Sequence, residues 1–138
     1  MIYGLSSTDK VITDPKEILK KGFMYFLIYN KSDSNIFNGF TMSLKDILTT
    51  FVNQAEVKKD AAERLYTLYS KHFDKVSVNA EFVQDIESSG IENLFFSVSV
   101  VTKTGTVITF NQSVKIKNNT ISNLLDIEKE LNEKILNN

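Results

Sequence analysis

The 138-residue sequence contains no cysteine. A disulfide framework, a thiolate zinc site and a cysteine nucleophile are therefore excluded. Arginine is almost as scarce, because Arg64 is the only one, and the formal net charge is −1. Proteins that bind nucleic acid usually present a basic surface with arginines that contact phosphates and bases. The composition therefore disfavours a nucleic-acid-binding protein.

Histidine also occurs only once, as His72. Nucleophilic catalysis usually needs a base beside the nucleophile, most often histidine, and no serine lies in a Gly-x-Ser-x-Gly motif. We interpret His72 as a cation at a helix end, where it would suit the helix dipole, and not as a catalytic base. The glycines are scattered and form no phosphate-binding loop. The sequence thus predicts no enzyme, no catalytic residue and no cofactor.

Metal-binding and membrane-spanning patterns are missing as well. Residues 33–39, DSNIFNG, begin like a calcium loop, but Phe37 stands at a ligand position and the glycine comes one place late. An ordinary loop over residues 30–40 explains this stretch better, so we expect no metal. The longest apolar run, residues 22–29, is too short to cross a bilayer. The N-terminus lacks the pattern of a secretory signal, so we expect a soluble protein that is not exported.

The patterns that are present predict one α+β domain over residues 1–138. Capping residues and apolar spacing predict helices that start near Asp14 and Ser43, and a longer helix over about residues 56–72. Alternating apolar residues then predict a strand from Val76 and a hairpin over residues 93–116, with its turn at Thr104-Gly105. The expected order is ααα-βββ-α, with helices packed on a small antiparallel sheet and a core over about residues 14–117.

A last amphipathic helix is expected over residues 122–138. Its apolar positions Leu124, Ile127, Leu131 and Ile135 form a narrow seam on an otherwise charged helix. Such a pattern is typical of a peripheral or partner-facing helix. The seam, with Leu131 and Ile135 at its end, is therefore one candidate surface for a partner.

The long hairpin offers a second candidate surface. A strand at the edge of a sheet has backbone groups that another chain can extend by pairing with them. We expect partner contacts at Thr109, Asn111 and Gln112 in the outer arm, although the sequence leaves open which strand is the free edge. Together, the two surfaces favour an interaction module over an enzyme.

The order of these elements resembles the baseplate wedge, or sheath-initiator, family of contractile phage tails and related injection machines. Residues 17–48 resemble its first helices and loop, residues 60–83 its long helix and first strand, and residues 90–116 its hairpin. Where the family has Glu-Pro-Arg before the strand, this chain has Phe73, Asp74 and Lys75. Only Lys75 keeps the positive charge, and lysine cannot reproduce a bidentate arginine contact.

The resemblance implies a structural, non-catalytic subunit that joins wedge proteins and nucleates the first sheath ring. Its partners would be baseplate wedge proteins and tail sheath subunits, whose extended arms would add strands to its sheet, with contacts at Phe73, Asp74 and Lys75. Several copies would stand in a six-fold assembly, in the tail baseplate of the virion and in the host cytoplasm during assembly. The alternatives are another phage virion subunit, for neck or tail completion, or a small protein-binding accessory protein.

Overall fold

The computed structural model describes residues 14–28, 43–50, 53–84 and 90–136, and it confirms the α+β class. The loop expected over residues 30–40 lies outside these described residues. The helices are α1 (Pro15–Ile28), α2 (Leu44–Thr50), α3 (Gln54–Ser70) and α4 (Leu124–Leu131), the last continued by the π-helical turn η2 (Asn132–Leu136). The strands are β1 (Lys75–Gln84), β2 (Ile91–Val101), β3 (Val107–Lys117) and the short β4 (Thr120–Ile121).

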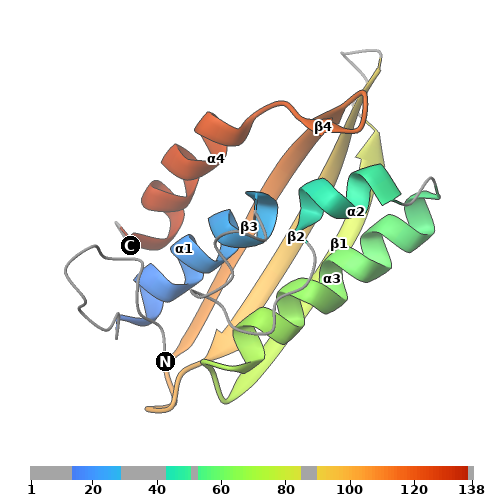
Figure 1. Cartoon of the computed structure of the whole chain (residues 1–138). Helices are drawn as coiled ribbons and strands as arrows, with labels where there is room; N and C mark the ends of the chain where they lie inside the picture. The colour runs from blue at the N-terminus through green and yellow to red at the C-terminus, as the bar shows by residue number, and fades with distance from the viewer. Residues whose placement is uncertain (1–13, 29–42, 51–52, 85–89, 137–138) are drawn as a thin grey trace.

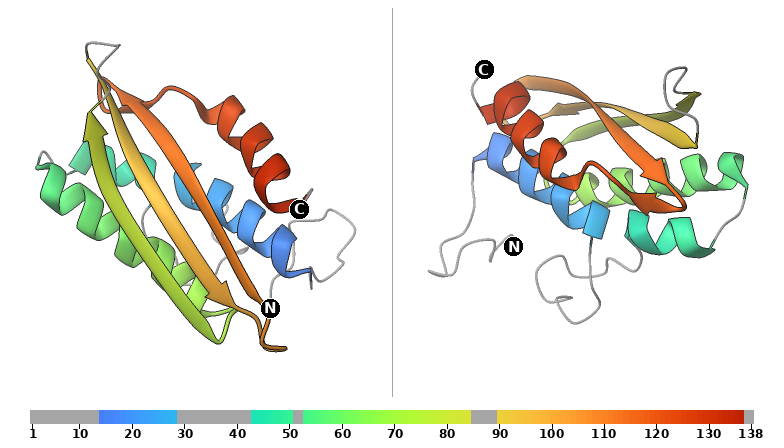
Figure 2. Two further views of the ribbon diagram at one scale, coloured as in Figure 1. Left: turned by 180° about the vertical axis from the view of Figure 1, so that it is seen from behind. Right: turned by 90° about the horizontal axis from the view of Figure 1, so that it is seen from above.

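The four strands form one antiparallel sheet in the order β1-β2-β3-β4. All the helices lie on one face of this sheet (Figure 1). Figure 2 shows the opposite face from behind, and no described element covers it. The described part of the chain is therefore a two-layer structure in which the strands bury one face only.

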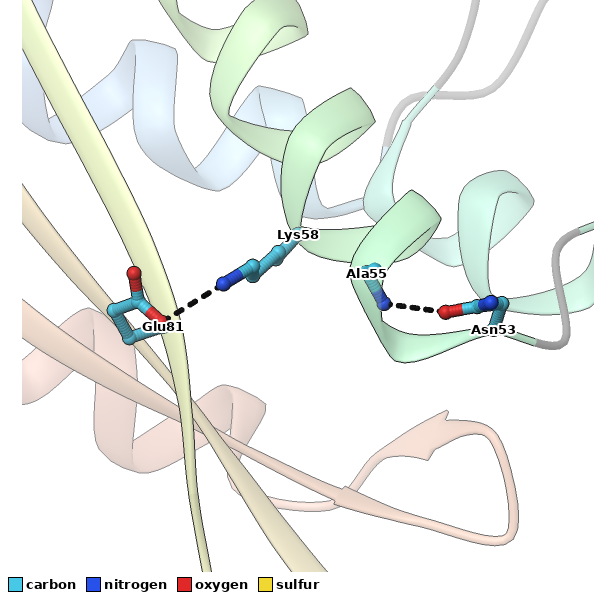
Figure 3. A network of polar contacts seen from close by, with 4 residues as sticks. All are labelled: Asn53, Ala55, Lys58 and Glu81. Atoms are coloured by element: carbon cyan, nitrogen blue, oxygen red, sulfur yellow. Dashed lines mark hydrogen bonds and ion pairs between the residues drawn. The ribbon is translucent and has the colours of Figure 1, made fainter.

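Side chains at the helix starts confirm one sequence-based expectation and refine another. Ser43 and Asp46 form a reciprocal capping box: Asp46 N–H donates to Ser43 Oγ at 3.3 Å, and Ser43 N–H donates to Asp46 Oδ2 at 3.4 Å. The α3 helix starts slightly before the expected residue because Asn53 caps it, with Oδ1 accepting Ala55 N–H at 2.7 Å (Figure 3).

Four phenylalanines join the helix layer to the sheet. Phe23 of α1 meets Phe96 of β2 at a ring-centroid distance of 5.5 Å and Phe110 of β3 at 5.8 Å, both edge to face. Phe26, one turn further along α1, meets Phe96 at 5.8 Å in the same arrangement. All four rings are buried. Such pairs add to the free energy gained from apolar burial, so α1 is the helix that closes the centre of the sheet.

A close contact joins α1 to α3. Tyr69 of α3 is fully buried and donates its hydroxyl to Leu19 O of α1 at 2.6 Å. Burial raises the pKa of Tyr69 well above its usual value, so the hydroxyl keeps its proton. The two helices approach at Gly22, where a Cβ atom would lie only 3.0 Å from both Leu68 Cδ2 and Tyr69 Cε1. Glycine at this position therefore allows the helix pair to form.

Two tight turns shape the hairpins. Gly105 adopts a φ of 89°, which confirms the turn expected at Thr104-Gly105. Asn118 and Asn119 adopt φ values of 52° and 60°, and together they form the two-residue turn between β3 and β4. Asparagine tolerates the left-handed region, and two such residues in succession suit a type I′ hairpin turn. This turn was not among the features expected from the sequence.

The C-terminal helix differs from the peripheral, partner-facing helix that was expected. Leu131 is fully buried and Ile135 is only 2% exposed, and both belong to the same buried cluster as α1 and the sheet. The seam is narrow because α4 lies at the margin of the helix layer, so that only one stripe of it meets the core. The core therefore extends beyond residue 117.

The buried Tyr69 hydroxyl gives a direct test of the α1–α3 contact. Because a buried hydrogen bond contributes about 1 kcal/mol net, we expect Tyr69→Phe to lower the free energy of unfolding by about 1 kcal/mol in urea denaturation. The matched control is Tyr66→Phe on the same helix, where the side chain is 47% exposed. We expect the control to change stability by less than about 0.5 kcal/mol. Equal effects of the two substitutions would contradict this account.

Candidate protein-interaction site

Hydrogen bonds along β3 show which backbone groups point out of the sheet. Lys115 donates its N–H to Asn123 Oδ1 at 2.9 Å, and its carbonyl accepts Ser122 N–H at 2.8 Å, both away from β2. In an antiparallel ladder, successive residues turn their backbone groups to alternate sides. Lys115 is paired with Asn93 of β2, and Asn93 is paired with Val83 of β1. The backbone groups of Asn93 therefore point toward β1, and those of Val83 point toward β2. The β1 residues whose backbone groups point away from β2 are therefore Val76, Val78, Ala80 and Phe82.

The outer edge of β1 is open within the described part of the chain. The only strand paired with β1 there is β2, and the pairing runs without a bulge from Lys75 to Gln84. Edge strands are usually protected by proline, by bulges or by charges that point inward. The strand β1 has no proline, and its helix-facing side chains are all apolar at Val76, Val78, Ala80 and Phe82. Its charges, Lys75 and Glu81, belong to the uncovered face, so the edge is suited to pairing with another strand.

Helix α3 runs beside this edge and forms a hollow with it. The hollow is lined by Ala62, Glu63, Tyr66 and Thr67 of α3 and by Val78 of β1. Its lining is mainly apolar, and the small Ala62 side chain leaves room beside the larger Tyr66 ring, one turn further along the same helix face. The open backbone groups of Val78 and the apolar floor of the hollow are therefore neighbours.

An ion pair lies between α3 and β1 (Figure 3). Lys58 Nζ of α3 lies 3.0 Å from Glu81 Oε2 of β1. Glu81 belongs to the uncovered face, whereas Lys58 comes from the helix side, so the contact passes around the outer edge of β1. Both side chains are more than a third exposed. Such surface pairs contribute at most about 1 kcal/mol, so a binding partner could displace this one.

The outer edge of β3 is partly occupied by the chain itself. Asn111 O accepts a hydrogen bond from Lys134 Nζ at 2.7 Å, and Ser113 O accepts one from Asn123 Nδ2 at 3.3 Å. Gln112, expected to contact a partner, is 0% exposed. Its Nε2 donates to Glu130 Oε1 at 3.1 Å and to Ser113 O. Thr109 and Asn111 are exposed, so a partner could reach them. Gln112 is not accessible to a partner, because it is buried in the contact between β3 and α4.

The predicted contact triplet is divided between core and surface. Phe73 is only 6% exposed and packs edge to face on Tyr69 at 6.1 Å. Asp74 and Lys75 are exposed, and Asp74 N–H donates to Val101 O at 3.0 Å, which aligns the start of β1. Lys75 therefore stands at the beginning of the open edge, whereas Phe73 anchors the end of α3. The hollow could not be predicted from the sequence, because its residues belong to two elements that meet only in the fold.

His72 does not behave as the expected cation. Its pKa is lowered from 6.5 to about 4, chiefly by burial and to a smaller extent by nearby positive charges, among them Lys71 and Lys103. His72 is therefore neutral at neutral pH, and its interpretation as a cation that suits the helix dipole is wrong. The described residues include no group of three or more histidines or carboxylates able to hold a metal ion. None of the described helices is long and apolar enough to cross a membrane.

Comparisons with known proteins identify no relative. No family model matches the chain, and no curated protein or solved structure has significant similarity to it.

The lowered pKa of His72 predicts a loss of stability in acid. Between pH 6.5 and about 4 the unfolded chain binds more protons than the folded chain, so the free energy of unfolding should fall as the pH drops through this range. His72→Gln should make this fall shallower. Because the chain has one histidine, an NMR titration of its imidazole protons reports the folded pKa directly. A midpoint close to 6.5 would contradict the burial of this group.

Proposed function

We propose that the protein is a structural assembly subunit that binds a partner chain by accepting an extended segment of it as a further strand on β1. The observation that carries this proposal is the open edge of β1, which has no bulge and whose helix-facing side chains are apolar. Pairing of this kind derives affinity from backbone hydrogen bonds and specificity from pockets for alternate side chains. The protein acts in this role without catalysis.

The assembly that we propose is the baseplate of a contractile tail. There the protein would join wedge proteins and nucleate the first sheath ring, and extended arms of the sheath subunits would be the added strands. The support is the order of helices, strand and hairpin that resembles the wedge family, together with the open edge. Several copies around a six-fold ring would make individually weak contacts effective through multivalency.

Strand addition was expected on the outer arm of the hairpin, at residues such as Thr109. The proposed contact is instead on β1, because the side chains of Lys134 and Asn123 already bind carbonyl groups of Asn111 and Ser113 on β3. A second candidate function is that of another virion subunit or a small accessory protein. The same edge would serve either role with a different partner chain.

A proline at Val78 tests the proposed edge. Val78 N–H points away from β2, so Val78→Pro removes the donor that a partner strand needs and keeps the β1–β2 ladder. We expect about a tenfold or greater loss of partner binding or of incorporation into assembled particles, because a lost backbone bond and a strand-blocking ring act together. The circular dichroism spectrum should remain that of the folded protein.

Two controls make this result specific. Val78→Thr keeps the branched side-chain shape and the N–H, so it should lose much less binding than Val78→Pro. Thr109→Pro places proline at an outward-pointing position of β3, the opposite edge of the sheet. We expect it to leave binding intact. The proposed site is wrong if Thr109→Pro abolishes assembly while Val78→Pro assembles normally.

The baseplate role has its own test. Mass spectrometry of purified tail particles should detect this chain together with wedge and sheath proteins. Its absence from assembled tails would exclude the baseplate role. Detection with neck proteins only would favour the second candidate function.

A further inference from the structure

We infer that the hollow between α3 and β1 is an anchor pocket for one medium-sized apolar side chain of the partner's extended segment. This inference rests on the proposed strand addition and specifies the partner's chemistry. Its basis is the position of the hollow, which is lined by Val78 at the middle of the open edge and by Ala62 and Tyr66 of α3.

Strand pairing fixes where the anchor side chain lies. A partner residue placed opposite Val78 exchanges backbone hydrogen bonds with it, because Val78 N–H and C=O point outward. Side chains of directly opposed residues lie on the same face of a sheet and touch. The partner's side chain therefore enters the hollow beside Val78, over Ala62 and against the Tyr66 ring. Its two neighbours in sequence point to the uncovered face.

The lining selects the kind of side chain that fits. Ala62, Val78 and the ring of Tyr66 offer apolar surface, so burial of a valine or leucine side chain is favourable. Glu63 is the charged residue of the lining, and an aspartate at the anchor position would place a like charge beside it. Glycine would leave the hollow unfilled. The preferred anchor is therefore aliphatic.

The position of α3 decides between a bare segment and a second copy of this chain. In Figure 1 and in the rear view of Figure 2, the N-terminal part of α3 extends past β1 on the side away from β2. A strand added to β1 would therefore lie over α3. A second copy paired through its own β1 would bring its own α3 into the same space. The occupant is thus an extended segment that carries no helix layer beside it.

The Lys58–Glu81 ion pair limits the length of this segment. Because the pair passes around the edge of β1 at Glu81, a segment that covers Val76 to Ala80 meets open backbone groups only. A longer segment must first displace the pair. The partner is therefore a short extended stretch with one central aliphatic residue.

A peptide panel tests this inference. The probes are fluorescent acetyl-Lys-Thr-Thr-X-Thr-Thr-Lys-amide peptides in which X is Val, Leu, Thr, Gly or Asp, and fluorescence anisotropy measures their affinity for the full chain. We expect Val and Leu to bind about tenfold more tightly than Gly, from the apolar area buried. The Asp peptide should bind most weakly. Thr, which has the shape of valine and a high strand propensity, separates apolar burial from propensity.

Matched variants assign the preference to the hollow. Ala62→Leu fills the hollow and should remove the preference for valine, whereas Ala55→Leu, on an exposed site of the same helix, should keep it. An N-methyl group on X should abolish binding by every peptide, because it removes the donor of the paired strand.

The outcomes separate this inference from the proposed function. Peptides that bind and are blocked by N-methylation, but bind equally for every X, would overturn the anchor pocket and leave strand addition intact. Failure of all peptides at millimolar concentration would also overturn the inference, and the Val78→Pro assembly experiment would still decide the function. Sedimentation of the chain as a dimer that Val78→Pro dissociates would show that a second copy is the occupant, and would refute the inference.

Discussion

The packing of α1 against the sheet is the constraint on which the rest of the structure depends. Phe23 and Phe26 meet Phe96 and Phe110 edge to face and close the centre of one sheet face. Once α1 is fixed, the Tyr69 hydroxyl bond and the close approach at Gly22 set the position of α3. The hollow beside β1 therefore depends on this core packing together with the direct packing of α3 on β1.

The two edges of the sheet differ in whether their outward backbone groups have hydrogen-bond partners, and this difference supports a binding role. At β3, the short strand β4 and side chains of the C-terminal segment bind the outward backbone groups of Lys115, Ser113 and Asn111. At β1, the described residues leave the outward groups open while α3 provides an apolar floor. A chain that occupies part of one edge with its own residues and keeps the other free of bulges and proline, with apolar helix-facing side chains, has the features of a strand acceptor.

The sequence predicted most of the secondary structure, because periodicity and capping are local properties. Ser43 with Asp46 and the turn at Gly105 follow from neighbouring residues, and both were confirmed. The turn at Asn118 and Asn119 was missed, although asparagine tolerates the left-handed backbone region that such a turn requires. The burial of Leu131 and the lowered pKa of His72 depend on tertiary neighbours. The hollow was out of reach for the same reason, because Ala62 and Val78 meet only after α3 folds onto β1.

The most direct test of the open edge is residue-resolved amide hydrogen exchange along β1 in the isolated protein. The account predicts alternation: the N–H groups of Ser77 and Asn79, bonded to β2, should be protected, and those of Val76, Val78 and Ala80 should exchange quickly. Addition of a partner segment should then protect the second set. Equal protection of both sets in the isolated chain would contradict the account, because it would mean that the edge is already occupied.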